Sequence, residues 1–211
     1  MALSELAETA DIETSSDGYA RRFSGELGAW FLAVQEEATL AMLAPHRGAS
    51  VLDVGGGHGQ LTPALARQGY QVTVLGSDEV CRTRIQELLD NGQCQFRVGN
   101  LLHLPYSDRT FDVAVSFRLL SHVSRWRRFL AELTRVAREA VILDFPSVGS
   151  MNALTPVLFR VKRQVEENTR SYRSFREAEL VEAFAALGFE PADRYPQFFL
   201  PMVLHRVFGS R

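Results

Sequence analysis

The chain has 211 residues, of which 46% are hydrophobic and 23% charged, and its formal net charge is −2. This length suits one domain with a complete core and is short for two, and the composition is typical of a water-soluble globular protein. The slight negative charge argues against binding to a nucleic-acid backbone, and no apolar run approaches the length of a membrane span.

The chain opens on an acidic segment, residues 1–23, which we expect to be a tail that acts as a lid. Acidic residues occur before position 19 without a single basic one: Glu5, Glu8, Asp11, Glu13 and Asp17. The segment has neither the basic start nor the apolar core of a secretory signal. We therefore expect one domain over residues 24–211 of a cytoplasmic protein, with Cys81 and Cys94 as reduced thiols.

A helical pattern over residues 27–43 precedes the most informative stretch of the sequence. Ser50–Val54 predicts a buried strand, and Gly55, Gly57 and Gly59 follow it at every second position. Glycine tolerates positive φ and lets the backbone approach a ligand closely. A strand, a glycine loop and a helix over residues 60–68 predict a nucleotide-type site at the carboxyl edge of a sheet. The spacing differs from the G-x-G-x-x-G of dinucleotide-binding proteins.

Strands and helices then alternate along the chain. Further strands are expected over residues 70–75, 94–98, 111–116 and 140–145, and further helices over 78–90 and from 124 onward. This order predicts an α/β fold with a doubly wound, mostly parallel sheet.

The last third of the sequence is less regular. Residues 147–173 are expected to be an insertion that roofs the site, with helical pieces over 154–166. Ser174 and Glu177 form a capping box that predicts a helix ending at Gly188. Residues 189–200 and 202–208 are expected to close the sheet as two strands, although the last piece could instead be helical. The fold would then have seven strands, the last of them antiparallel.

The glycine stretch, read from Asp53 to Gly59, resembles the first motif of class I S-adenosylmethionine-dependent methyltransferases, D/E-x-G-x-G-x-G. The resemblance extends over residues 69–75, 98–100, 104–112 and 138–146. It is closest to the small-molecule methyltransferases of the quinone and natural-product type. It implies a Rossmann-like fold, S-adenosyl-L-methionine as the cofactor, and a small-molecule acceptor.

The resemblance also assigns roles to the first motif. Gly55, Gly57 and Gly59 would face the methionine moiety of the cofactor, whose carboxylate suits exposed backbone N–H groups. Asp53 would hold the cofactor ammonium, or it could merely fix the turn. His58 is expected to be a solvent-facing spacer within the loop.

The end of the second strand departs from the family pattern. In the family an acid here binds both ribose hydroxyls, whereas the alignment places Gly76 at that position. Ser77 and Asp78 follow immediately. Asp78 could reach back to the ribose, or it could only cap the helix that begins there.

The ends of the third and fourth strands supply the other candidates. Asn100 would face the adenine, with Leu101 beside it as an apolar surface, or it could be a turn asparagine. Phe117 and Arg118 lie where cofactor and acceptor would meet. Arg118 would hold an anionic acceptor or be an exposed charge, and His122 would be a general base or a structural histidine.

The sequence therefore predicts methyl transfer from S-adenosyl-L-methionine to a small molecule, on oxygen or carbon rather than nitrogen. No metal site, nucleic-acid partner or membrane span is expected, and the oligomeric state is left open. Two alternatives remain open: a non-catalytic protein that keeps the fold, which Gly76 favours, and a nicotinamide-dependent oxidoreductase, which the glycine spacing disfavours.

Overall fold

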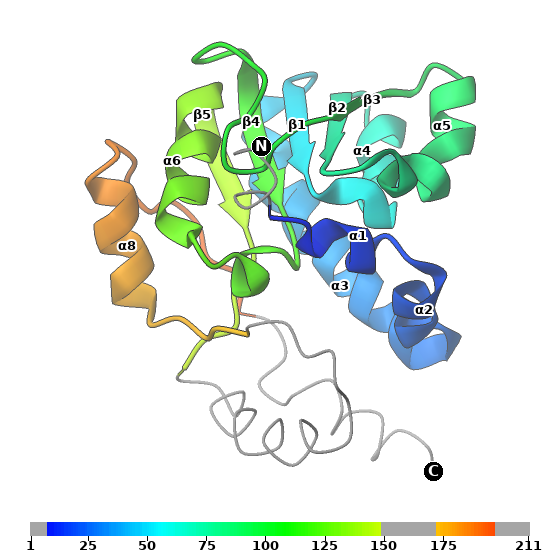
Figure 1. The fold of residues 1–211 in the computed structure, drawn as a ribbon, viewed down its shortest axis with the longest axis horizontal. Helices are drawn as coiled ribbons and strands as arrows, with labels where there is room; N and C mark the ends of the chain where they lie inside the picture. Colours follow the sequence, from blue (N-terminus) through cyan, green and yellow to red (C-terminus); the bar gives the residue numbers. More distant parts are fainter. Residues whose placement is uncertain (1–7, 149–171, 197–211) are drawn as a thin grey trace, which may run out of the picture.

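A five-stranded parallel sheet forms the centre of the computed structural model, which describes residues 8–148 and 172–196 (Figure 1). The strand order is β3-β2-β1-β4-β5. The strands are β1 (Ser50–Val54), β2 (Gln71–Gly76), β3 (Cys94–Val98), β4 (Phe111–Ser116) and β5 (Ala137–Leu143). The order reverses between β1 and β4, and such a switch point is where open α/β sheets bind ligands.

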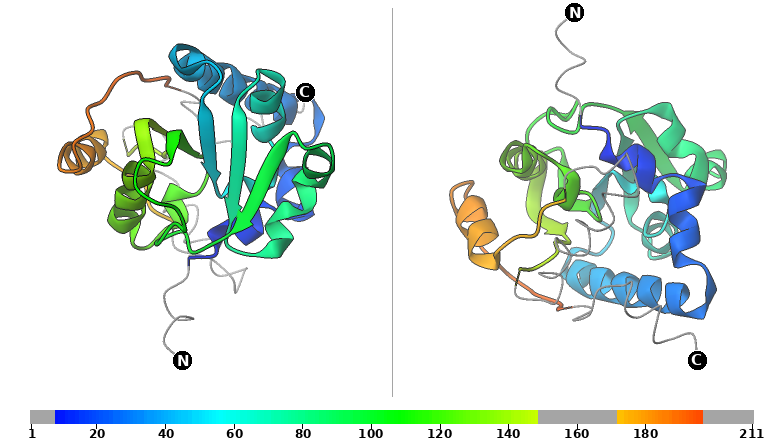
Figure 2. Two further views of the ribbon diagram at one scale, coloured as in Figure 1. Left: turned by 90° about the horizontal axis from the view of Figure 1, so that it is seen from above. Right: turned by 60° about the horizontal axis from the view of Figure 1, so that its bottom comes forward.

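Helices lie on both faces of the sheet (Figure 2). They are α1 (Ala10–Thr14), α2 (Asp17–Ala20), α3 (Gly25–Leu43), α4 (Thr62–Arg67), α5 (Gln86–Asp90), α6 (Trp126–Val136) and α8 (Glu177–Ala185). Short 3-10 turns are η2 (Arg21–Phe23), η3 (Ala44–His46), η4 (Gly56–His58), η5 (Glu79–Ile85) and η6 (Leu120–His122). None of the helices in the described ranges is both long enough and apolar enough to cross a membrane.

The alternation of side chains along β1 produces two hydrophobic cores. Leu52 and Val54 pack with α6 and α8, whereas Val51 packs with Leu65 of α4 on the other face. All of these residues are fully buried. Burial on both faces explains why β1 reads as a continuous hydrophobic run.

The first five expected strands are confirmed, with β5 beginning at Ala137, three residues early. The expected helix over residues 78–90 is a 3-10 turn, η5, followed by α5. Val80 and Thr83 are β-branched, and such residues are poor helix formers.

The expected capping box at Ser174 is wrong. The helix begins at Glu177, and its N-cap residue, Arg176, makes no side-chain cap bond. Phe175 N–H donates to Pro146 O at 2.8 Å, and the Phe175 ring lies 5.3 Å from that of Trp126. These contacts hold residues 174–175 in an extended bridge, so the helix starts later.

The sheet has five parallel strands in the described ranges, and residues 189–196 form no strand. The remainder of the two expected closing strands lies outside the described residues, as do the helical pieces expected over 154–166.

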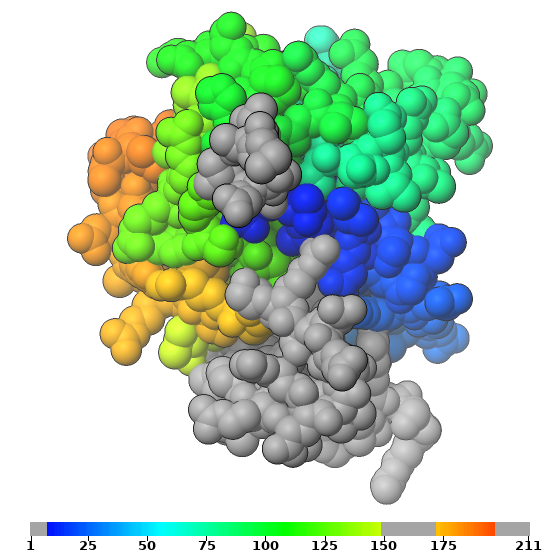
Figure 3. Space-filling model, viewed as in Figure 1, coloured from blue at the N-terminus to red at the C-terminus, as the bar shows by residue number. Residues whose placement is uncertain are grey.

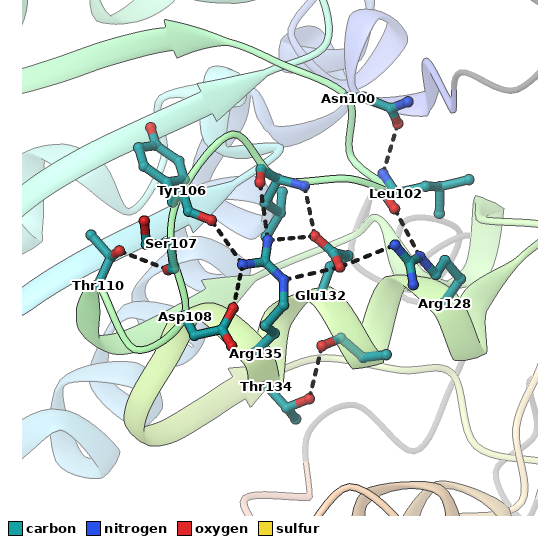
Figure 4. A network of polar contacts seen from close by, with 12 residues as sticks. Asn100, Leu102, Tyr106, Ser107, Asp108, Thr110, Arg128, Glu132, Thr134 and Arg135 are labelled. Carbon is teal, nitrogen blue, oxygen red and sulfur yellow. Dashed lines mark hydrogen bonds and ion pairs between the residues drawn. The ribbon is translucent and has the colours of Figure 1, made fainter. Parts of the chain in front are cut away.

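A polar network fixes the loop between β3 and β4 against α6 (Figure 4). The buried carboxylate of Glu132 accepts from Leu104 N–H at 2.8 Å and from Arg135 Nη2 at 2.7 Å. Arg135 also donates to the carbonyls of Leu104 and Tyr106 and to the Asp108 carboxylate. Burial alone would raise the pKa of Glu132, but the bonds from Arg135 and Leu104 hold it below its usual value.

Candidate cofactor site

The predicted glycine loop connects β1 to α4 at the switch point of the sheet. Gly55 and Gly59 have positive φ angles of 79° and 67°, and Gly55 N–H donates to Leu75 O of β2 at 2.8 Å. Gly57 is required for a different reason, because a side chain at this position would not fit. A Cβ atom there would lie 2.4 Å from the Cys81 carbonyl oxygen and 2.6 Å from Ser15 Oγ. The loop is therefore wound tightly, with other backbone pressed against it.

Asp53 lies beneath this loop and is fully buried. Its Oδ2 accepts from Thr62 Oγ1 at 3.3 Å, and its Oδ1 has no hydrogen-bond partner among the described residues. A Cβ atom at Gly56 would lie 2.0 Å from Oδ2, so the carboxylate directly underlies the turn. Burial raises the pKa of Asp53 to about 7. An unused buried acceptor suits a cationic donor such as an ammonium group.

The raised pKa of Asp53 predicts a pH dependence of stability. Between pH ~4 and ~7 the unfolded chain has lost this proton while the folded protein retains it, so the free energy of unfolding should fall as the pH rises. Asp53→Asn should flatten that decline in urea unfolding measured from pH 4.5 to 8. Asp193→Asn, at an exposed position, should keep the wild-type slope. Equal slopes for wild type and Asp53→Asn would contradict the raised pKa.

The expectation that His58 faces solvent is wrong, because η4 turns its ring inward and leaves it 1% exposed. Its Nδ1 accepts from Gln60 N–H at 3.2 Å, and burial, with Arg118 and Arg84 nearby, lowers its pKa to about 3. The neutral ring therefore carries its proton on Nε2, which has no partner in the described ranges. The position of His58 within the glycine motif does not indicate that its Nε2 is a buried donor.

At the end of β2, Gly76 has no room for a side chain. A Cβ atom there would lie 2.7 Å from Cys81 Cβ and 3.0 Å from the Phe96 ring. The Asp78 carboxylate accepts from Val80 N–H at 2.9 Å and caps η5, in agreement with the capping alternative. Ser77 donates from its N–H and its hydroxyl to the carboxylate of Asp11, both at 2.6 Å.

Asp11 is thus a carboxylate at the end of β2 that sequence reasoning missed. It belongs to α1, far away in the sequence, and it is fully buried. Its place in the acidic tail was the only available signal, and five acids share that feature.

The residues after β3 form a turn. Asn100 Oδ1 accepts from Leu102 N–H at 2.8 Å, so the amide oxygen serves the local backbone. Leu101 is fully buried in the core shared with α6. Phe117, after β4, is 5% exposed and packs in the core on the opposite face of the sheet.

Arg118 is held at the end of β4 in a strained conformation, with φ 60°. Its N–H donates to Asp144 Oδ1 at 2.6 Å, and its guanidinium donates to Gln35 Oε1 and lies 4.2 Å from the centre of the Phe23 ring. Burial lowers the pKa of Arg118. Its buried Nη1 has no hydrogen-bond partner within the described part of the chain.

His122 lies four residues further on, in η6. Its ring is 5.7 Å from that of Tyr172, at an interplanar angle of 62°. Burial raises the pKa of the Tyr172 hydroxyl to about 12. Arg118 and His122 therefore lie on one loop after β4, whereas Asp53 lies under the glycine loop.

A parallel sheet with a glycine loop at its switch point defines a nucleotide-binding class of protein, and comparison with known proteins narrows it. Residues 52–143 match the family model described as a methyltransferase domain. The chain is 30% identical over 146 residues to a protein of Mycolicibacterium smegmatis named a probable S-adenosylmethionine-dependent methyltransferase, covering 69% of this chain and 54% of that one. A ubiquinone biosynthesis O-methyltransferase of Rhizobium etli is 25% identical over 167 residues, covering 75% of this chain and 66% of that one.

Among solved structures, magnesium protoporphyrin IX methyltransferase from Synechocystis, with bound S-adenosylhomocysteine, matches with a TM-score of 0.67 and 20% identity. The match covers 85% of this chain and 87% of that one, and it shows the shared fold. Residues 52–143 are thus a methyltransferase domain, and the chain has the fold of the class I S-adenosylmethionine-dependent methyltransferases. The chain spans about half the length of two curated relatives that it matches, 54% and 41%.

Proposed function

We propose that this chain transfers a methyl group from S-adenosyl-L-methionine to the oxygen or carbon of a small-molecule acceptor. The observation that carries the proposal is the buried Asp53 carboxylate, with one unused oxygen, under a tight glycine loop of a methyltransferase domain. Relatives named as O-methyltransferases support the choice of oxygen.

The atoms without partners around the loop fit a zwitterionic ligand. Asp53 Oδ1 is an acceptor for an ammonium group, and His58 Nε2 is a donor for a carboxylate. The cofactor would supply an activated methyl group on a sulfonium. The role of the protein is then to bind, to align the two reactants and to exclude water.

The space beside the loop does not fit the ligand in this conformation. Ser15 Oγ lies 2.6 Å from where a Gly57 Cβ would be, and Asp11 Cβ lies 3.5 Å from the corresponding point at Gly55. Side chains of the N-terminal segment therefore fill the face of the loop that a bound nucleoside would need.

For the acceptor side, we propose Arg118 as the anion-binding residue and His122 as the general base. Arg118 forms no ion pair with a carboxylate in the described ranges, and its Nη1 is unused, which suits an anionic or phenolic acceptor. The neighbouring Asp144 carboxylate accepts from the Arg118 N–H, and burial raises its pKa.

Several broader features also remain proposals. We propose that the chain after α8 completes the sheet with two strands, the last antiparallel, and that residues 147–173 roof the acceptor. We also propose a cytoplasmic protein without a nucleic-acid partner, which the net charge of −2 supports.

Calorimetric titration tests the class of ligand. S-adenosylhomocysteine should bind saturably, and NAD should show no binding at the same concentrations, because the loop offers partners for an amino-acid zwitterion. Saturable NAD binding without S-adenosylhomocysteine binding would favour an oxidoreductase. Binding of neither would favour a non-catalytic protein with this fold.

A further inference from the structure

The N-terminal strap, residues 8–17, crosses the carboxyl end of the sheet. Within it, α1 contacts both η4 of the glycine loop and η5 after β2. Figure 2 shows α1 at this end of the sheet, and Figure 3 shows it on the surface between the green segment around η6 and the teal segment around η5. The strap therefore lies on the candidate cofactor site, although its sequence is remote from every motif of that site.

Three acidic side chains of the strap accept hydrogen bonds from the segments that it crosses. Glu8 accepts from Ser124 N–H at 2.9 Å, before α6. Asp11 accepts from Ser77, after β2, and from Cys81 Sγ at 3.4 Å. Asp17 accepts from Arg84 Nη1 at 2.8 Å, in η5. The acidic side chains of the strap thus attach it to the rest of the domain.

Asp11, the middle anchor, is buried and hydrogen-bonded through both carboxylate oxygens, as a bound ligand would be. Both carboxylate oxygens of Asp11 accept hydrogen bonds at 2.6 Å from Ser77, and the side chain is fully buried. Asp11 and Ser15 also face Gly55 and Gly57 across the loop. No ligand atom can occupy this space while the strap is seated, because protein atoms already fill it.

Two polar atoms at the same loop have no partner in the described ranges. Asp53 Oδ1 and His58 Nε2 are both buried there without a hydrogen bond. His58 belongs to η4, which α1 contacts, and Asp53 underlies the turn at Gly56. Buried polar atoms of this kind are normally satisfied. Both atoms are therefore available to a ligand at this loop.

We propose that residues 8–17 form an autoinhibitory strap, in which Asp11 occupies the nucleoside site and must leave before the cofactor binds. The inference rests on the proposed function, because it assumes that the site takes S-adenosyl-L-methionine. The closed strap reduces apparent affinity by the fraction of molecules that are open. Weakening an anchor therefore tightens binding, whereas removing a true ligand contact would weaken it.

Asp11→Ala tests the direction of this effect in the full chain. We expect S-adenosylhomocysteine to bind at least about five-fold more tightly than to wild type in calorimetry, because the closed state loses its main anchor. Asp17→Ala, at the exposed Arg84 anchor, should act in the same direction more weakly. Asp193→Asn removes an exposed acid outside the strap and should leave the affinity unchanged.

Hydrogen exchange gives a readout that does not depend on any ligand. Amides of residues 10–15 should exchange faster in Asp11→Ala than in wild type, and faster in wild type when S-adenosylhomocysteine is added. A lid that closes over the cofactor would instead slow exchange of these amides on binding.

A covalent lock tests the strap without removing an anchor. Ser15 Oγ and Cys81 Cβ lie 2.6 Å and 2.9 Å from the point that a Gly57 Cβ would occupy, so Ser15→Cys brings two thiols close together. Oxidation should close a disulfide and abolish binding of S-adenosylhomocysteine, and dithiothreitol should restore it. Wild type treated in the same way controls for oxidation of Cys81 and Cys94.

These outcomes separate the two hypotheses. Equal or weaker binding by Asp11→Ala, or full binding by the oxidised Ser15→Cys protein, would overturn the strap. Faster exchange in Asp11→Ala, with S-adenosylhomocysteine binding to no variant, would keep the closed strap while refuting the proposed function and, with it, the inhibitory role.

Discussion

Gly57→Val is expected to weaken binding of S-adenosylhomocysteine by about 100-fold or more, beyond detection in a calorimetric titration. A Cβ atom at this position would lie 2.4 Å from the Cys81 carbonyl oxygen and 2.9 Å from Cys81 Cβ. Cys81 belongs to η5 rather than to the strap, so release of the strap cannot relieve the overlap. The loop must move away from η5, and the cradle for the ligand is lost.

The matched control is Gly48→Val in the turn before β1. Gly48 has a positive φ of 73°, and a Cβ atom there would meet nothing within 4 Å. This substitution imposes backbone strain at the opposite end of β1 without touching the site. It should lower stability and leave affinity near that of wild type. Retained affinity in Gly57→Val would mean that the cofactor binds away from this loop.

Glu132→Ala is expected to cost about 3–5 kcal/mol in the free energy of unfolding, measured by urea denaturation at pH 7. The substitution leaves the Leu104 N–H without its acceptor and deprives Arg135 of its buried partner. The loop between β3 and β4 would then lose its attachment to α6. Glu182→Ala, at an exposed position of α8, should change the unfolding free energy by less than about 0.5 kcal/mol.

The ion pair between Glu132 and Arg135 also predicts how the free energy of unfolding changes with pH. Because the pKa of Glu132 is lowered in the folded protein, its stabilisation is fully present above the unfolded pKa and is lost as the pH falls through the folded value. The difference between wild type and Glu132→Ala should therefore narrow in acid. A constant difference down to pH 3 would contradict this account.

Local patterns were sufficient to predict the sheet and the glycine loop. β1 is buried on both faces, so its hydrophobic run is unambiguous, and the spaced glycines of 55–59 have few structural uses besides a tight turn at a ligand. The amphipathic spacing of α6 was equally clear, because Phe129, Leu130 and Leu133 are fully buried.

Contacts between remote segments could not be predicted from such patterns. Asp11 meets Ser77 across 66 positions, and nothing in the tail distinguishes it from the other four acids. His58 turns inward because of the η4 geometry, which its spacing does not encode. The capping box expected at Ser174 is wrong because a tertiary contact overrides the local pattern: Phe175 is buried in the core against Trp126.

The bridge at Phe175 has a consequence for how such a protein diversifies. Val148 N–H donates to Phe175 O at 3.0 Å, and Arg173 N–H donates to Ser121 O at 2.9 Å. These bonds fasten residues 148 and 173–175 to one another and to the loop that carries Arg118 and His122. We expect that lengthening or exchanging the sequence between positions 148 and 172 leaves the register of β5 and the placement of α8 unchanged, because the entropy of closing a longer connection rises only slowly. Under the proposed function, acceptor preference can then diversify by insertion or grafting at this position, while the glycine loop is inherited unchanged.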